Sequence, residues 1–170
     1  MPGKTEYVYW DTCVFLYFLS RDPTRHPAIE AALDELKSTG RRRVATSLIA
    51  KVEVAYLDCE ALNRELNPAL EQQIDLLWSD YSVFQVVEFS EPIALAARSL
   101  VRQAKEECLR VDGQRSRGLK PPDAIHLATA QWLGASRICS YDPHLTHWAH
   151  LVGIPVVEPQ PIQPRLLNHT

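Results

Sequence analysis

An aspartate interrupts the most apolar stretch of this sequence, VYWDTCVFLYFL at residues 8–19. Burying an isolated carboxylate in an apolar core is costly, so the position of Asp11 limits how this run can fold. Residues 7–10 have the short, aromatic-rich composition of a strand, and Asp11 follows them directly. The same aspartate breaks the run before it reaches the roughly 20 apolar residues that a membrane-spanning helix needs. We therefore predict a carboxylate at the end of a first strand and no membrane-spanning segment.

Strand-like and helix-like segments alternate along the chain. We expect strands near residues 7–10, 44–45, 83–89, 137–140 and 156–158, and helices near 14–19, 26–40, 48–57, 68–78, 92–109 and 122–133. Such alternation predicts an α/β fold, with a central, mostly parallel sheet between two layers of helices. The length of 170 residues suits one domain over 1–170, with a core at about 6–158 and an extended, proline-rich tail at 159–170.

The overall charge indicates no preferred class of partner. The formal net charge is −3, so any basic patch of the kind that nucleic-acid-binding proteins carry has to be local. The four cysteines form no C-x-x-C pair, which predicts buried thiols in a reducing compartment rather than a disulfide framework. Together with a start that has no apolar signal segment, this favours a cytoplasmic protein.

Two acidic residues follow predicted strands. Asp11 comes directly after the strand at residues 7–10, and Asp142 comes shortly after the strand at residues 137–140. If both strands are parallel, their carboxyl ends meet at one edge of the sheet, and this is the edge where α/β proteins bind ligands. We therefore expect Asp11 and Asp142 on the same side of the molecule.

Two further acidic residues lie on helix faces that are otherwise apolar. Asp123 is in the first turn of the helix at 122–133, on a face with Leu127, and Glu53 is near the start of the helix at 48–57. The other members of the Glu53 face are Ile49, Tyr56 and Leu57. Each acid alone is explained as a helix cap, a dipole partner or a turn residue. All four on one predicted edge instead favour a shared site.

Four carboxylates in one pocket require cations. Two carboxylates about 4 Å apart repel each other by roughly 4 kcal/mol at an effective dielectric constant of 20. Oxygen ligands without a His or Cys set favour Mg²⁺ or Mn²⁺ over zinc. Metal ions held in this way bind a phosphodiester and activate water for in-line attack. The acidic pattern therefore predicts a metal-dependent phosphodiester chemistry.

Four segments, in order, resemble the acidic motifs of the PIN-domain ribonucleases, and most nearly those of VapC-type toxins from bacterial toxin–antitoxin pairs. They are YWDTCVFLYFL, TSLIAKVEVAY, PPDAIHLATA and CSYDPHL. The resemblance implies a PIN-like three-layer α/β/α fold. It also implies catalytic, metal-ligating roles for Asp11, Glu53, Asp123 and Asp142, with Asp142 supporting a second metal or orienting the water. Ser140 fills the place of a supporting hydroxyl residue near the last acid, and Thr12 is expected to support the site beside Asp11.

The same resemblance implies an activity and partners. It implies Mg²⁺- or Mn²⁺-dependent endonucleolytic cleavage of RNA, inhibition of translation, silencing by an antitoxin protein, and a homodimer. One position departs from the family pattern. Members often have an asparagine two residues after the first aspartate, where this chain has Cys13, and a thiol is a weak hydrogen-bond partner.

Basic and histidine residues near the acids are weaker candidates. Arg115, Arg117 and Lys120 lie in the polar loop that leads to Asp123, where they are candidates for contact with RNA phosphates. We expect His126 to be a buried, hydrogen-bonded residue rather than a catalytic base. His144, His147 and His150 are spaced by three residues without completing a zinc set, so we expect them on the surface.

Two other functions fit part of the sequence pattern. One is a PIN-like module that binds RNA or a protein without cleavage, an alternative that Cys13 leaves open. The other is a metal-carboxylate phosphotransfer or phosphatase domain with Asp11 as phospho-acceptor. The second alternative needs a lysine on a later strand, and the sequence has no lysine after Lys120.

Overall fold

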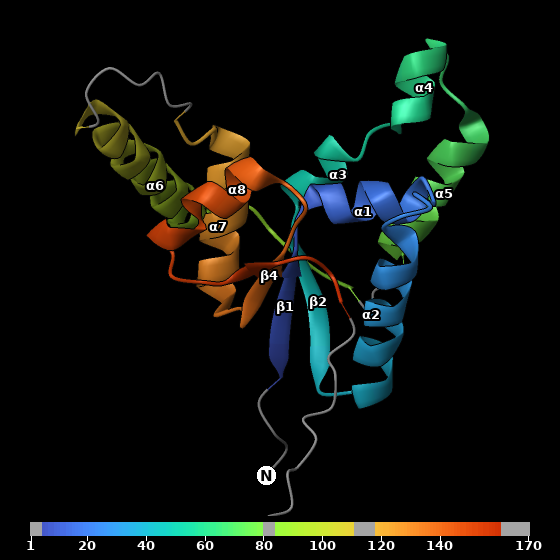
Figure 1. The fold of residues 1–170 in the computed structure, drawn as a ribbon, viewed down its shortest axis with the longest axis horizontal. Helices are drawn as coiled ribbons and strands as arrows, with labels where there is room; N and C mark the ends of the chain where they lie inside the picture. The colour runs from blue at the N-terminus through green and yellow to red at the C-terminus, as the bar shows by residue number, and fades with distance from the viewer. Residues whose placement is uncertain (1–4, 80–83, 111–117, 161–170) are drawn as a thin grey trace, which may run out of the picture.

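A computed structural model describes residues 5–79, 84–110 and 118–160 of the chain (Figure 1). Strands and helices alternate along these residues, as the sequence pattern predicts. The elements, in chain order, are β1 (Glu6–Trp10), α1 (Thr12–Leu19), α2 (His26–Thr39), β2 (Arg42–Ser47), α3 (Ile49–Glu53), α4 (Asp58–Asn63), α5 (Pro68–Ser79), β3 (Phe84–Val87), α6 (Glu91–Arg110), α7 (Pro121–Leu133), β4 (Arg137–Cys139), α8 (Pro143–Trp148), the 3₁₀ turn η1 (Ala149–Leu151) and β5 (Val156–Val157).

The described strands form one parallel sheet. Its order is β3-β2-β1-β4-β5, so β1 is the central strand and pairs with β2 on one side and β4 on the other. Val8 of β1 is in register with Val44 of β2, and Tyr9 is in register with Ile138 of β4. Because all pairs are parallel, the carboxyl ends of the strands share one edge, at the top of Figure 1. The predicted α/β fold with a parallel sheet is confirmed.

Alternating side chains of β1 face two separate cores. Val8 and Trp10 pack on one face of the sheet with α1, α2 and α5, whereas Tyr9 packs on the other face with α6, α7 and α8. Successive strand residues point to opposite faces, so this alternation buries both faces of the sheet under helices, as the three layers of Figure 1 show. The predicted three-layer α/β/α arrangement is therefore confirmed.

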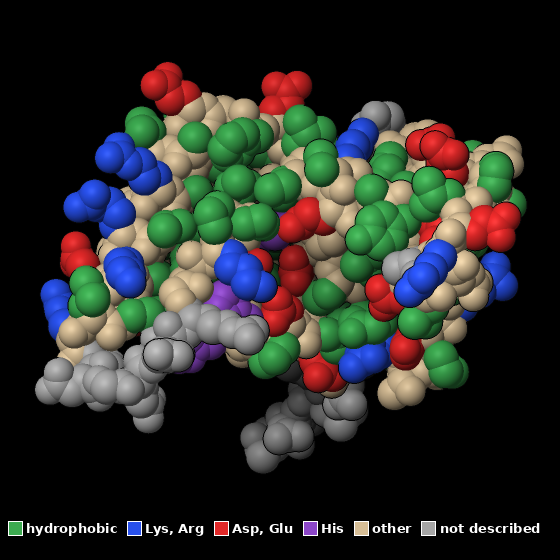
Figure 2. All heavy atoms as spheres, turned by 90° about the horizontal axis from the view of Figure 1, so that it is seen from above, with side chains coloured by type: hydrophobic (Ala, Val, Ile, Leu, Met, Phe, Trp, Pro, Cys, Tyr) green, Lys and Arg blue, Asp and Glu red, His purple; other side chains and the backbone are tan. Residues whose placement is uncertain are grey.

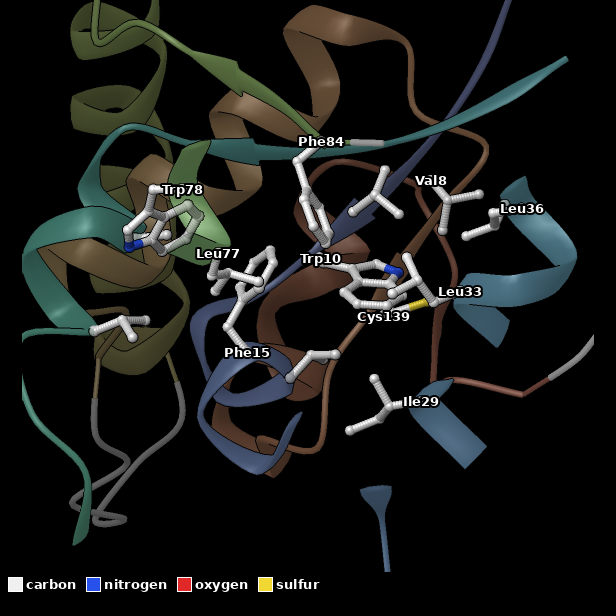
Figure 3. Packing of buried hydrophobic residues seen from close by; sticks show 14 of the residues in the cluster. Val8, Trp10, Phe15, Ile29, Leu33, Leu36, Leu77, Trp78, Phe84 and Cys139 are labelled. Atoms are coloured by element: carbon white, nitrogen blue, oxygen red, sulfur yellow. The ribbon is translucent and has the colours of Figure 1, made fainter. Parts of the chain in front are cut away.

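Aromatic rings fix α1 against the first of these cores. The ring centroid of Phe15 lies 5.7 Å from that of Trp10, 5.1 Å from that of Trp78 and 5.7 Å from that of Phe84. Figure 3 shows Phe15 projecting from α1 toward Trp10 and Phe84. Since α1 begins at Thr12, directly after Asp11, this packing also fixes the backbone on both sides of that aspartate.

The single helix predicted at residues 48–57 is wrong. Helix α3 ends at Glu53, Val54 has non-helical torsion angles (φ −87°, ψ 54°), and α4 begins at Asp58. The Glu60 carboxylate accepts a hydrogen bond from the backbone N–H of Leu57 at 2.8 Å, which satisfies a donor at the start of the new helix. Val54 and Leu57 are both buried. The break between α3 and α4 therefore lets both apolar side chains pack in the interior, in positions that differ from those in a continuous helix.

The cysteine prediction is only partly correct. None of the four cysteines, all of which lie among the described residues, is in a disulfide, and Cys139 is buried. Cys59 is exposed on α4, and Cys13 and Cys108 are half-buried. The exposure of Cys59 follows from the helix break, because α4 projects away from the sheet in Figure 1.

None of the helices within the described ranges is both long enough and apolar enough to cross a membrane. The domain limits proposed from the sequence stay a prediction. Of the expected tail at 159–170, residues 161–170 lie outside the described part of the chain.

Candidate active site at the carboxyl edge of the sheet

The predicted acidic residues come from the carboxyl edge of the sheet and from the helices that begin there. Asp11 directly follows β1, and Asp142 is the N-cap residue of α8, shortly after β4. Glu53 ends α3, and Asp123 lies in the first turn of α7. Seen from above in Figure 2, acidic side chains gather near the middle of this face beside histidine, and hydrophobic side chains lie on both sides of them.

Asp11 is a buried carboxylate with three hydrogen-bond donors. Its Oδ1 accepts the backbone N–H of Thr12 at 2.7 Å, and its Oδ2 accepts the hydroxyl of Ser140 at 2.8 Å. The thiol of Cys13 donates to the same Oδ2 at 3.2 Å. The structure thus brings Thr12 and Ser140, both predicted as supporting residues, into contact with Asp11. These donors compensate for the burial of its charge.

Cys13 is held in place from several sides. Its Sγ accepts the backbone N–H of Tyr141 at 3.2 Å and lies 3.4 Å from the Ser140 hydroxyl, in addition to its contact with Asp11. Burial, together with the negative charge of Asp11, raises the pKa of the Cys13 thiol to about 12. The thiol therefore keeps its proton at neutral pH and donates it to Asp11.

Glu53 and Asp11 meet at His126. The Glu53 Oε2 atom lies 2.7 Å from His126 Nε2 and accepts the Thr12 hydroxyl at 2.5 Å. The same Nε2 atom lies 3.7 Å from Oδ1 of Asp11. Glu53 keeps 30% of its side-chain surface exposed, whereas His126 is almost fully buried. Two of the predicted ligands, separated by 42 positions in sequence, thus share one buried histidine.

The predicted reason for the inward position of Glu53 is wrong, although the side chain does face the site. Tyr56 is 52% exposed and, like Leu57, lies beyond the end of α3. The apolar face assumed for a continuous helix therefore does not exist. Glu53 is oriented by its hydrogen bonds to Thr12 and His126 instead.

Burial and hydrogen bonding act in opposite directions on the pKa values of His126 and Glu53. Burial acts to lower the pKa of His126, but the hydrogen bond to Glu53 and the charges of Asp11, Glu53 and Asp123 outweigh it, so the pKa is raised. Burial acts to raise the pKa of Glu53, but the hydrogen bond and charge of His126 and the Thr12 hydroxyl outweigh it, so that pKa is lowered. Both shifts favour the charged forms and strengthen the contact.

The second pair of acids meets at His144. Its Nδ1 lies 2.8 Å from Oδ2 of Asp123, and its backbone N–H donates to Oδ1 of Asp142 at 2.8 Å. The prediction of a surface position is wrong for His144, whose side chain is only 21% exposed, whereas His147 and His150 are exposed as expected. No spacing in the sequence indicates this pairing, because α7 and α8 are brought together only by packing.

Electrostatic interactions connect the two pairs. Burial raises the pKa of Asp123, and the negative charge of Asp142 raises it further, while the hydrogen bond from His144 opposes both. Asp123 lies one helical turn before His126 and contributes to the raised pKa of that histidine. Electrostatic interactions therefore link all four predicted acids, because Asp142 acts on the pKa of Asp123 and the other three acids act on the pKa of His126.

The donor chemistry of this region fits a hard divalent cation. Carboxylate oxygens are the ligands that Mg²⁺ and Mn²⁺ prefer, and all four predicted ligands supply them. Within the described residues, however, no group of three or more His, Cys, Asp or Glu side chains forms a ready metal-binding cluster. Here His126 and His144 occupy one oxygen each of Glu53 and Asp123.

Of the predicted RNA contacts, only Lys120 lies among the described residues. It is exposed and is the N-cap residue of α7, and its charge acts to lower the pKa of Asp123. Arg115 and Arg117 lie outside the described residues.

Sequence reasoning missed the contribution of Tyr9. Its hydroxyl lies 2.7 Å from Nδ1 of His126, a residue that was correctly predicted to be buried and hydrogen-bonded. Tyr9 precedes Asp11 by two positions, and this period-two spacing was the available signal. Burial raises the pKa of Tyr9 well above its usual range, and the charge of Asp11 adds to the effect.

Comparison with known families supports the resemblance. The sequence profile described as "PIN domain" matches residues 8–151. No curated protein matches this sequence significantly.

Solved structures share the fold. A toxin–antitoxin complex from Klebsiella pneumoniae is 25% identical, with a TM-score of 0.55, over 91% of this chain and 99% of that one. VapBC2 from Rickettsia felis, bound to a DNA fragment from its promoter, has a TM-score of 0.62 at 11% identity, over 89% and 98% of the two chains. Mycobacterium tuberculosis VapC20, a toxin that cleaves the sarcin–ricin loop, has a TM-score of 0.52 at 18% identity, over 92% and 99%.

Proposed function

The chain belongs to the PIN domain family, and from this membership we propose that it is a Mg²⁺- or Mn²⁺-dependent endoribonuclease that acts as the toxin of a type II toxin–antitoxin pair. One observation carries the proposal. Asp11 and Glu53 lie at the same nitrogen of His126, while Asp123 and Asp142 contact His144 on the adjoining helix. This pairing supports the proposal, because the four proposed ligands come from β1, β4 and the helices next to them, at the edge of the sheet where α/β proteins bind ligands.

Asp11, Glu53, Asp123 and Asp142 are the residues that we propose hold the metal. When bound, a divalent ion polarises a phosphoryl oxygen and neutralises the charge that develops during phosphodiester cleavage. The chain contributes an ordered set of oxygen donors. Asp11 is fixed by three hydrogen bonds, and only Oε2 of Glu53 is used in its contacts with Thr12 and His126, which leaves Oε1 for a cation.

We propose that substrate phosphates are attracted by cations beside the acids. Lys120 is exposed at the start of α7, close enough to Asp123 to affect its pKa. Arg115 and Arg117 are proposed to act in the same way from the preceding loop. Such contacts position an RNA backbone without reading its bases, so they do not determine which RNA is cut.

The partners follow from the same proposal. Structures with the same fold are toxin–antitoxin complexes, and the VapC20 toxin cleaves the sarcin–ricin loop. We propose that this chain likewise binds an antitoxin protein that blocks the acidic edge, forms a homodimer, and acts on RNA in the cytoplasm.

The test is cleavage of total bacterial RNA by purified protein with Mg²⁺ or Mn²⁺, with and without EDTA. Asp11→Asn and Asp123→Asn remove proposed ligands, and Asp34→Asn is a matched control, because Asp34 is exposed on α2. We expect cleavage by wild type and Asp34→Asn only, and only without EDTA. Cleavage that survives EDTA or both ligand variants would contradict the proposal.

A PIN-like module that binds RNA without cleaving it is the second candidate. The observation in its favour is that the donor to Asp11 at position 13 is a thiol, which is a weak hydrogen-bond partner. This candidate predicts a shift of RNA mobility in a native gel with no cleavage under any divalent metal. The same RNA preparation therefore distinguishes the two functions.

A further inference from the structure

A continuous path of hydrogen bonds runs behind the acidic site, from the end of β2 to Glu53. The backbone N–H of Ser47 donates to the Tyr9 hydroxyl at 3.1 Å, and that hydroxyl lies 2.7 Å from Nδ1 of His126. The other ring nitrogen, Nε2, lies 2.7 Å from Oε2 of Glu53. Ser47, Tyr9 and His126 are all buried. None of these three side chains belongs to the proposed ligand set.

We propose that Tyr9 and His126 are positioning residues, which hold Glu53 in place by keeping a proton on Nε2 of His126. The proposal rests on the proposed function in one respect, because it takes Glu53 as a metal ligand.

The direction of each hydrogen bond follows from donor chemistry. A backbone N–H only donates, so the Tyr9 oxygen is an acceptor toward Ser47, and an ionised carboxylate only accepts, so Nε2 of His126 is the donor toward Glu53. In a neutral ring, the proton on Nε2 leaves Nδ1 as an acceptor, and the Tyr9 hydroxyl donates to it. Nε2 therefore carries its proton toward the Glu53 carboxylate. When the ring is charged, both nitrogens carry protons and the contact with Glu53 has the same direction.

The opposite tautomer would be unfavourable at the Glu53 end. With the proton on Nδ1, the lone pair of Nε2 would face a carboxylate oxygen at the observed distance of 2.7 Å. The Thr12 hydroxyl lies 3.1 Å from Nε2 but already donates to Glu53. Buried polar atoms without partners are costly, so Tyr9 and Glu53 together select one tautomer.

Glu53 needs such a support because of where it lies. It is the last residue of the five-residue helix α3, and the chain leaves helical geometry at Val54. Tyr9 lies two residues before Asp11 on the central strand, and its side chain is fully buried. Through Tyr9 and His126, the position of Glu53 is therefore tied to the same strand that places Asp11. Residues that hydrogen-bond to a metal ligand and fix its orientation typically contribute 10- to 100-fold to metal affinity.

The experiment uses the full chain, with Tyr9→Phe as the main variant and Tyr7→Phe as its matched control on the same strand. In metal-free protein with ¹⁵N-labelled histidine, at a pH where the ring is neutral, the ring ¹⁵N shifts identify the tautomer. We expect the Nε2–H form alone in wild type and Tyr7→Phe, and a mixture with a smaller share of that form in Tyr9→Phe, where Glu53 alone selects the tautomer. An Nδ1–H form of His126 in wild type would overturn the proposal.

Mn²⁺ affinity, measured by water proton relaxation, provides the second readout. We expect Tyr9→Phe to bind Mn²⁺ about 10- to 100-fold more weakly than Tyr7→Phe. His126→Gln, whose amide N–H reaches the position of Nε2, should retain more affinity than His126→Asn, whose shorter side chain does not. If Tyr9 and His126 only stabilised the fold, the Mn²⁺ affinity of each variant would instead fall in proportion to its loss of thermal stability.

The two proposals fail in different ways. Wild-type protein that binds no Mn²⁺ would overturn the proposed function, whatever tautomer His126 adopts. Wild-type binding that is unchanged in Tyr9→Phe would overturn the positioning role alone.

Discussion

The thiol of Cys13 donates a hydrogen bond to Oδ2 of Asp11, with 3.2 Å between the sulfur and the oxygen. Asp11 is buried, so each donor to its carboxylate matters for folding as well as for the orientation of the side chain. Cys13 thus supplies one of the three donors that hold this carboxylate.

Cys13→Ala should destabilise the protein by about 1–3 kcal/mol, because it removes a donor from a buried carboxylate. Cys13→Ser keeps a donor of similar size and should cost less. Urea denaturation of the metal-free protein measures both changes, with Cys59→Ala, at an exposed position, as control. Equal stability of the Ala and Ser variants would show that the hydrogen bond to Asp11 contributes nothing.

Alkylation should distinguish the same two cysteines. Burial and the charge of Asp11 raise the pKa of Cys13 to about 12, so its reactive thiolate is rare at pH 8. Cys59 is exposed and should react with iodoacetamide first. Peptide mapping after partial alkylation measures the order, and modification of Cys13 ahead of Cys59 in folded protein would contradict the thiol assignment.

Removing His126 should flatten the dependence of stability on pH. Its pKa is raised in the folded chain above the unfolded value of about 6.5, so its stabilising contribution is complete below pH 6.5. That contribution is lost as pH rises through the folded pKa. The free energy of unfolding of metal-free protein should therefore fall above pH 6.5, and fall less in His126→Gln.

His150 also has a raised pKa, through its hydrogen bond to the backbone of His147 and its contact with Glu107. Both proteins in this comparison should therefore carry His150→Gln, and the slope rather than the absolute stability is the quantity compared. Identical slopes with and without His126 would show that its pKa is not raised by folding.

His144→Ala should raise the pKa of Asp123 further. Burial and the charge of Asp142 already raise this pKa, and the hydrogen bond from His144 is the main opposing effect. Titration of the ¹³C-labelled side-chain carboxyl of Asp123 in metal-free protein measures the change. His147→Ala is the control, because His147 is exposed on the same helix. A lowered or unchanged pKa in His144→Ala would contradict the observed pairing.

Phe15→Ala should destabilise the protein by about 3–5 kcal/mol, as expected for a fully buried phenylalanine. Phe15 contacts three aromatic rings and holds α1 against the sheet directly after Asp11. Leu62→Ala is the control, since Leu62 is 83% exposed and should change stability by less than about 0.5 kcal/mol. Chemical denaturation measures both variants, and similar effects at the two positions would contradict the packing.

The sequence by itself determined the α/β class, the parallel sheet and the edge at which Asp11 and Asp142 lie. These features depend on local patterns, because alternation of strands and helices restricts the topology and a residue that follows a parallel strand must lie at its carboxyl end. The prediction that His126, one helical turn after Asp123, is buried was also correct.

Only the tertiary structure decided how the acids are held. The break after Glu53 depends on Glu60 bonding the backbone of Leu57, and the contact of His144 with Asp123 depends on how α8 packs beside α7. Tyr9 and His126 are separated by 117 positions and meet only across the sheet–helix interface. Such contacts join backbone segments whose separation in space no local pattern encodes, which is why spacing along the chain identified the acids but not their partners.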